Sequence, residues 1–209
     1  EEADRWIQEA KSEKVDGLIL LLLDRQQHSW PTVRKASESD IPLIVFSPLG
    51  TSFTTNTADF AKKSGCVIYS TNNFKQVVYG MNMLKAKAKM NRTKCVVIKG
   101  DKREEKKLAE TGITLQYVPA DTFINIYNNT PDNKDIIAMA DDYIRHAQSI
   151  RLATREDVIN GIKSYVVAGK ILEAEKSDAI SMDCLGALGN KNVSLPCIAW
   201  SRMNDDRIP

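Results

Sequence analysis

Two continuous apolar runs of strand length flank a helical pattern near the start of the chain. Residues 18–23 read Leu-Ile-Leu-Leu-Leu-Leu, and residues 41–46 read Ile-Pro-Leu-Ile-Val-Phe. A run that is apolar at every position is typical of a parallel strand covered on both faces. Residues 30–39 between the runs have helical spacing, and Pro31 is tolerated in a first helical turn. This order of elements predicts the βαβ unit of a doubly wound sheet.

The same alternation continues along the chain. A long helix is expected at residues 74–90, and Thr154 with Asp157 predicts a capping box at the start of a second long helix. The charged segment 102–110 is also expected to be helical. Further strands are expected at residues 66–69, 95–98, 115–118 and, as a closing pair, within 177–209. The pattern predicts an α/β fold with two Rossmann-like (flavodoxin-like) lobes, each of three αβα layers around a mainly parallel sheet.

A segment rich in threonine, serine and asparagine separates the first elements from the rest. Residues 51–57 are predicted to form a loop or linker, followed by a helix at 58–63 that ends at Gly65 in a left-handed cap. We therefore expect a partial N-terminal α/β lobe at residues 1–52. A middle α/β lobe is expected at residues 53–209.

Composition narrows the class of protein. The chain has 209 residues, of which 43% are hydrophobic and 27% are charged, and its net charge is +2. This balance indicates no binding to nucleic acid or to an anionic membrane, and no apolar run approaches the roughly 20 residues that span a bilayer. The four cysteines lack C-x-x-C spacing and there are only two histidines, which argues against structural zinc. Reduced thiols are expected, as in a cytoplasmic protein.

The chain carries none of the common nucleotide-binding or hydrolase motifs, so candidate site residues come from predicted strand ends. Asp183 and Cys184 follow a strand-like run, and the carboxyl ends of parallel strands line the ligand crevice of an α/β sheet. Helix capping is the alternative role for Asp183. His28 either contacts a ligand or lies on the surface. Trp30 either stacks on the face of a sugar or packs beneath the helix.

The C-terminal stretch resembles a known family. Residues 177–186 read Ser-Asp-Ala-Ile-Ser-Met-Asp-Cys-Leu-Gly, and residues 195–205 read Leu-Pro-Cys-Ile-Ala-Trp-Ser-Arg-Met-Asn-Asp. Together with residues 15–18, 40–43 and 69–80, they resemble the fucose/arabinose isomerase family of sugar isomerases. The resemblance covers the whole chain, is sharpest after Ser177 and rests on strand-end motifs.

The resemblance implies that the full-length protein interconverts aldoses and ketoses through an ene-diol with a divalent metal, usually manganese. It implies that Cys184 and Arg202 lie near the substrate and that the metal-binding carboxylates lie outside these residues. No catalytic and no metal-binding residue is therefore expected in this chain, and the 209-residue piece is expected to be inactive alone. The front of the first lobe is expected to be missing. A homo-oligomer is expected for the full-length protein.

A non-catalytic sugar-binding protein of the periplasmic-binding or repressor-core type is the alternative, because two βαβ lobes also describe proteins that close around a sugar. A scaffold that has lost its catalytic residues is a third interpretation. The first two share a small-molecule sugar as the partner, and fold alone does not separate the three.

Overall fold

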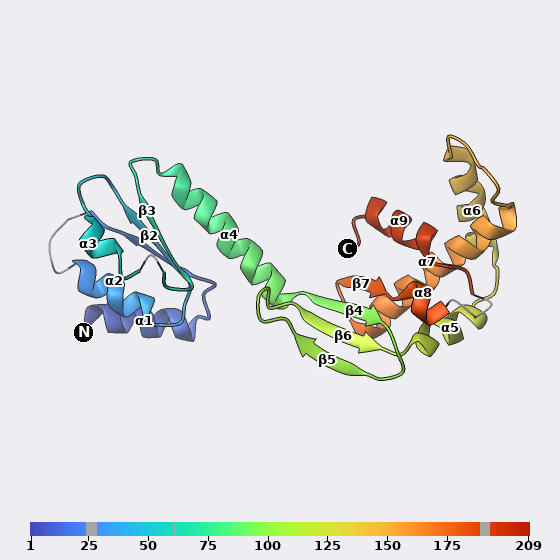
Figure 1. The fold of residues 1–209 in the computed structure, drawn as a ribbon, viewed down its shortest axis with the longest axis horizontal. Helices are drawn as coiled ribbons and strands as arrows, with labels where there is room; N and C mark the ends of the chain where they lie inside the picture. Colours follow the sequence, from blue (N-terminus) through green and yellow to red (C-terminus); the bar gives the residue numbers. More distant parts are fainter. Residues whose placement is uncertain (24–28, 61, 189–192) are drawn as a thin grey trace. The chain divides into compact units, whose positions relative to one another are not determined.

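The computed structural model describes residues 1–23, 29–60, 62–188 and 193–209, and Figure 1 traces the chain from the N-terminus in blue to the C-terminus in red. Its internal contacts divide it into two compact units, Glu1–Lys89 and Met90–Pro209. Each unit combines helices with a sheet that is wholly or mostly parallel. The predicted α/β, Rossmann-like fold class is confirmed.

The first unit is built on a three-stranded parallel sheet. The strand order is β1-β2-β3, and Leu21, Phe46 and Tyr69 lie side by side in register. Its elements are α1 (Glu2–Ser12), β1 (Leu18–Leu21), α2 (Ser29–Ser37), β2 (Leu43–Ser47), α3 (Thr54–Thr57), β3 (Cys66–Ser70) and α4 (Lys75–Arg92).

The two faces of this sheet are covered differently. On one face, Leu43 of β2 packs with Trp30 of α2 and with Phe60 in the main apolar core of the unit. On the other face, α4 comes close to β2 because residue 80 is glycine. A Cβ atom at Gly80 would lie 2.8 Å from Ile44 Cδ1, so a larger residue would push the helix away from the strand.

The boundary between the units differs from the predicted one. β3 pairs with β2 along its whole length, so residues 53–89 belong to the first unit and not to a second lobe starting at residue 53. The segment 51–57 is a connection within the first unit, where Ser47 Oγ and Thr51 Oγ1 lie 2.7 Å apart. The boundary was misplaced because threonine, serine and asparagine are common both in linkers between domains and in surface loops within one domain. The helix expected at 58–63 is replaced by α3, and residues 58–60 form a turn.

The second unit has a four-stranded sheet in the order β5-β6-β4-β7. β4 pairs in parallel with β6 and β7, whereas β5 is an antiparallel edge strand. The elements are β4 (Lys94–Ile98), β5 (Glu104–Lys107), β6 (Thr114–Val118), α5 (Ala120–Asn128), α6 (Lys134–His146), α7 (Arg155–Glu175), β7 (Ala179–Met182), α8 (Cys184–Leu188) and α9 (Cys197–Asp205).

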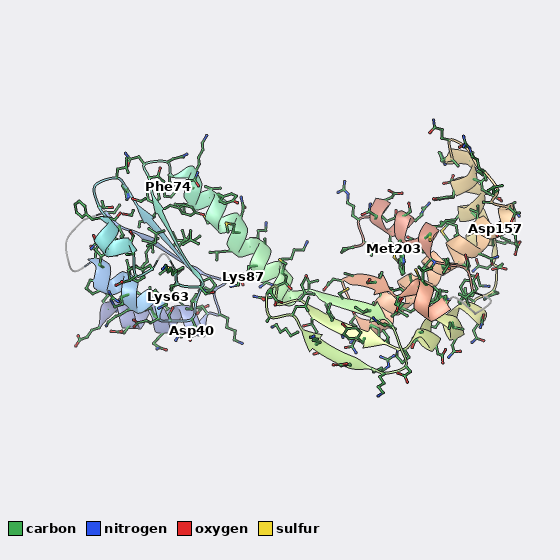
Figure 2. The ribbon with its side chains drawn as sticks, viewed as in Figure 1. Asp40, Lys63, Phe74, Lys87, Asp157 and Met203 are labelled. Carbon is green, nitrogen blue, oxygen red and sulfur yellow. The ribbon has the colours of Figure 1, made fainter. Side chains whose placement is uncertain are left out.

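Two apolar clusters hold the helices of this unit. In the larger one, Phe123 of α5, Ile171 of α7 and Met203 of α9 pack with Ile98 of β4 (Met203 is labelled in Figure 2). In the smaller one, Ile136 and Ala140 of α6 pack against α7. Helix α7 belongs to both clusters, so it is the central support of the unit.

The start of α7 confirms the predicted capping box. The backbone N–H of Thr154 donates to Asp157 Oδ2 at 2.7 Å, and the backbone N–H of Asp157 donates to Thr154 Oγ1 at 3.2 Å. Next to it, Arg155 grips Asp141 of α6 with two hydrogen bonds of 2.7 and 2.9 Å. This ion pair links the start of α7 to the preceding helix α6.

Two further predicted elements are wrong. Residues 102–110 contain β5 and not a helix, because Glu104–Lys107 pairs with β6; its charged side chains are all exposed, as suits an edge strand. The last expected strand is the helix α9, in which Ala199 and Met203 are buried one helical turn apart. Arg202 therefore lies on a helix and not at a strand end. Among the described residues, no helix is long and apolar enough to cross a membrane.

Candidate functional site

The carboxyl end of β7 carries the two residues that the sequence placed at a ligand crevice. Asp183 is exposed, and its Oδ1 accepts a hydrogen bond from the backbone N–H of Gly186 at 3.2 Å, within the first turn of α8. A Cβ at residue 186 would lie 2.7 Å from Asp183 Oδ2, so a larger residue there would displace the Asp183 carboxylate from this contact. Asp183 thus has the alternative role, helix capping, and Cys184 beside it is half-buried. Substrate contact by either residue stays a prediction.

Trp30 is part of the core of the first unit. It is 8% exposed, and its ring stacks on Phe60 with centroids 6.0 Å apart and an angle of 26° between the planes. The packing alternative describes this residue, because a sugar cannot reach a face that Phe60 covers. His28 lies outside the described residues. Trp30 belongs to the first unit, whereas Asp183, Cys184 and Arg202 belong to the second.

Arg202 lines a pocket of the second unit that the sequence did not predict. Helices α6 and α9 border a cavity of about 440 Å³. The cavity is rich in groups that accept or donate hydrogen bonds, and we call it the α6–α9 pocket. Its lining residues are Asp142, Tyr143, His146 and Ala147 on or next to α6, and Arg202, Asp205 and Asp206 on or next to α9.

Asp206 and Tyr165 hold Arg202 in place. The Tyr165 hydroxyl donates to Asp206 Oδ2 at 2.8 Å, and this hydrogen bond, with burial as a smaller cause, raises the pKa of Tyr165, so that the phenol keeps its proton. Arg202 Nε lies 3.6 Å from the same carboxylate oxygen, and the guanidinium carbon lies 5.8 Å from the Tyr165 ring centroid. Within the described part of the chain, the buried Nε–H of Arg202 has no hydrogen-bond partner.

His146 contributes from the other wall. Its Nδ1 lies 2.9 Å from the backbone carbonyl oxygen of Asp142, one turn earlier on α6. In the neutral imidazole this contact assigns the proton to Nδ1, which leaves Nε2 as a hydrogen-bond acceptor. The carboxylate of Asp142 lies 3.5 Å from both His146 Nδ1 and Arg145 Nη1.

These groups make the α6–α9 pocket suited to a hydroxylated ligand. The three carboxylates accept hydrogen bonds from hydroxyls, and the guanidinium of Arg202 donates them. The imidazole of His146 and the phenol of Tyr143 can do either. Tyr143 supplies an aromatic surface for the apolar side of a ring. In the ranges that the structure describes, no group of three or more histidine, cysteine, aspartate or glutamate side chains is arranged to hold a metal ion.

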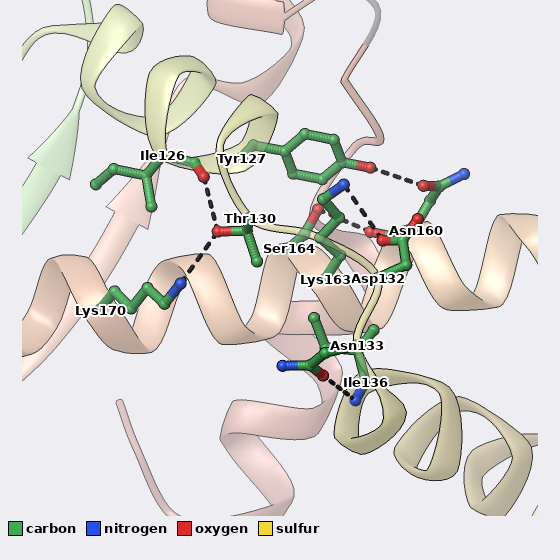
Figure 3. A network of polar contacts seen from close by, with 10 residues as sticks. All are labelled: Ile126, Tyr127, Thr130, Asp132, Asn133, Ile136, Asn160, Lys163, Ser164 and Lys170. Atoms are coloured by element: carbon green, nitrogen blue, oxygen red, sulfur yellow. Dashed lines mark hydrogen bonds and ion pairs between the residues drawn. The ribbon is translucent and has the colours of Figure 1, made fainter.

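A second polar cluster, shown in Figure 3, connects α5, α6 and α7. Lys163 Nζ lies 3.2 Å from Asp132 Oδ1 and 4.7 Å from the Tyr127 ring centroid, and the Tyr127 hydroxyl donates to Asn160 Oδ1 at 3.0 Å. Lys170 Nζ likewise donates to Thr130 Oγ1 at 3.1 Å. Because these groups already bind each other, we interpret the cluster as structural support.

Sequence reasoning missed most of the α6–α9 pocket. Asp142 and His146 lie four residues apart and so share one face of α6, but this spacing is common on exposed helices and gave no signal of its own. Arg202 was selected for a position at a strand end and is on a helix instead. The pocket depends on the packing of α9 against α7, a contact that no local pattern specifies.

Comparison with known proteins gives no further identification. A scan against models of protein families finds no match to this chain, and a search of curated proteins finds no significant relative. The resemblance to sugar isomerases therefore stays a prediction from the residues quoted for it.

Proposed function

We propose that this chain binds a small-molecule sugar, as the N-terminal and middle part of a sugar isomerase-like protein of carbohydrate metabolism. The observation that carries the proposal is the α6–α9 pocket, where Arg202 and Asp206 line the same cavity as Asp142 and His146 of α6. The residue that the resemblance placed near the substrate lies in a pocket with the chemistry that a sugar needs.

The donors and acceptors support a sugar more than an apolar ligand. Sugar hydroxyls both donate and accept, so they match the carboxylates of Asp205 and Asp206 and the guanidinium of Arg202, which line the same cavity. A hydrogen bond to a charged group contributes about 1.5–3 kcal/mol, more than one between neutral groups. The volume of about 440 Å³ falls within the usual range for small-ligand pockets.

The proposal gives these 209 residues binding but no turnover. The ene-diol chemistry of the resembled family uses a divalent metal, here manganese, as the electrophile for two sugar oxygens. The resemblance places the carboxylates for that ion outside the chain. We further propose a cytoplasmic, homo-oligomeric full-length protein; the four unpaired cysteines are in keeping with a reducing compartment.

The alternative of a periplasmic-binding or repressor-core protein has less support. Such proteins usually connect their lobes by several crossovers. Here the first unit is residues 1–89 and the second is residues 90–209, so the chain passes between them once, within α4.

Titration of the 209-residue chain with a panel of aldopentoses and aldohexoses, followed by calorimetry and NMR, tests the proposal. We expect saturable binding without metal, weakened about tenfold or more in Arg202→Gln because a charge-assisted donor is lost. Arg103→Gln is the matched control: Arg103 also pairs with a carboxylate, that of Glu175, but lies outside the pocket. If no sugar binds, or if both variants bind like the unaltered chain, the proposal is wrong.

A further inference from the structure

A different cavity lies in the first unit, between α4 and strands β2 and β3. It measures about 230 Å³, and its walls come from apolar groups on both layers. Ile44, Val67 and Tyr69 line it from the sheet, and Met83 lines it from the helix. We call it the α4 cavity. It lies between the helix and the face of the sheet, and its lining extends along β3 from Gly65 to Tyr69.

The helix α4 packs closely at two glycines that lie beside the α4 cavity. At Gly80, α4 lies so near the sheet that a Cβ would be 2.8 Å from Ile44 Cδ1. One turn further on, Leu84 fills the space above Gly17, where a Cβ would be 2.5 Å from Leu84 Cδ1. Val67 lies beside these contacts and is 39% exposed, so the cavity is open to solvent along β3.

One cation borders this apolar space. Lys87 lines the α4 cavity from the last turns of α4, where Figure 2 labels it, and the residue is exposed. A lysine stem packs along apolar surface while its ammonium group stays in water. In the described part of the chain, Lys87 has no ion-pair or hydrogen-bond partner. The site therefore offers an apolar interior and a single positive charge at its edge.

We propose that the α4 cavity binds the tail of a medium-chain aliphatic carboxylate, with the carboxylate beside Lys87. An enclosed apolar cavity of about 150 Å³ accepts a ligand the size of benzene, which has six carbons. On that scale a cavity of about 230 Å³ accepts roughly eight to nine carbons. The charge of Lys87 favours a carboxylate over an alcohol or an amine of the same length. This site is independent of the proposed sugar pocket, which lies in the other unit.

A chain-length series tests the size of the site. Hexanoate, heptanoate, octanoate, decanoate and dodecanoate are titrated into the 209-residue chain, with calorimetry for affinity and NMR shifts at Val67 and Gly80 for location. Each buried methylene contributes about 0.8 kcal/mol, so affinity rises about fourfold per carbon and then levels off at roughly eight to nine carbons. No saturable binding, or a rise that continues to dodecanoate, overturns the proposal.

Two variants test the chemistry. Val67→Phe fills the α4 cavity from a half-exposed strand position where an aromatic is well tolerated, and we expect it to abolish binding. Lys87→Gln keeps most of the stem and removes the charge; we expect octanoate affinity to fall about two- to fivefold and octanol affinity to stay unchanged. Lys85→Gln, on the same helix but outside the cavity, is the matched control.

The competing occupant is a side chain from a second copy of the chain. Sedimentation velocity across a range of concentrations separates this outcome from ligand binding. A dimer that Val67→Phe dissociates, with no response of the unaltered chain to octanoate, overturns the proposal. A monomer whose NMR shifts at Val67 saturate with octanoate supports it.

Discussion

The two pockets differ because they form between different layers of a similar α/β design. The α4 cavity lies between a helix and a sheet, so its walls are the apolar faces that pack a core. The α6–α9 pocket lies between two helices whose buried residues, such as Ala140 and Met203, pack elsewhere. Its walls are therefore the outward, charged faces of those helices. The layer in which a pocket forms decides whether it suits an apolar or a polar ligand.

The cores of the two units, unlike their pockets, are built alike. Each has a stacked aromatic pair: Trp30 with Phe60 in the first unit, and Phe123 with Tyr127 in the second, at a centroid distance of 6.3 Å. Phe123 is fully buried and Phe60 is 3% exposed. The same substitution can therefore be made in each unit, and we can compare which of the two sheets it destabilises.

The largest expected effect is that of Phe123→Ala. Removing a buried phenylalanine ring costs about 3–5 kcal/mol, and we expect the loss to be confined to the second unit. Native-state hydrogen exchange measures it: amides of β4 lose protection and amides of β2 do not. The matched variant Phe60→Ala is expected to reverse the pattern. If either variant lowers the protection of both sheets equally, the units unfold as one and the comparison between them fails.

Alanine substitutions at two glycines of α7 are expected to change stability by an intermediate amount and in opposite directions. A Cβ at Gly161 would lie 2.6 Å from Ile198 Cδ1 of α9, whereas a Cβ at Gly169 would meet nothing within 4 Å. We expect Gly161→Ala to destabilise the second unit by about 1–3 kcal/mol through overpacking. Gly169→Ala is expected to stabilise it by about 0.5–1 kcal/mol, because alanine favours the helix over glycine. Urea unfolding measures both changes.

A double variant tests the cause assigned to the first change. Gly161→Ala with Ile198→Val removes the nearest methyl carbon, and part of the lost stability is expected to return. Two changes of the same sign in the single variants, or no recovery in the double variant, contradict the packing of α7 against α9. The α6–α9 pocket depends on that packing, so this result bears on the pocket as well.

Elements with a strong local signal were predictable from the sequence. The apolar runs gave β1 and β2, helical spacing gave α4, and Thr154 with Asp157 gave the start of α7. The burial read from the apolar runs is right for β2, which is buried at every position, but wrong for β1, because Ile19 and Leu21 are exposed on one face of the sheet. The fold class followed from these elements alone.

Elements that depend on distant partners were not predictable. Glu104–Lys107 has no apolar residue, so nothing local indicates β5 until β6 pairs with it. The run Cys197–Trp200 is short and apolar, which suits a strand or a helix, and burial of Ala199 and Met203 against α7 selects the helix. The α6–α9 pocket forms only when α6 and α9 are both folded and packed. Of its residues, the sequence pointed to Arg202 alone, and it did so because Arg202 was expected at a strand end.

The smallest expected effect compares an aspartate in the first turn of one helix in each unit, Asp157 of α7 and Asp4 of α1, as the pH falls. Asp157 accepts two hydrogen bonds from Thr154, and these lower the pKa of its carboxyl below 3.8. In the first unit, an ion pair with Lys35 and contact with the N-terminal ammonium lower the pKa of Asp4 in the same direction. A lowered pKa means that the folded state favours the carboxylate, so this stabilisation is present above about pH 4 and is lost as the pH falls through the folded value.

We therefore expect the start of α7 to lose exchange protection below about pH 4, and Asp157→Asn to remove that dependence without changing the behaviour of α1. Asp4→Asn is the reciprocal control, because it alters α1 and leaves α7 as it is. Carboxyl carbon NMR shifts give the midpoint of each titration directly. A midpoint for Asp157 above 3.8 shows that the capping box does not hold the carboxylate, and the geometry assigned to the start of α7 is then wrong.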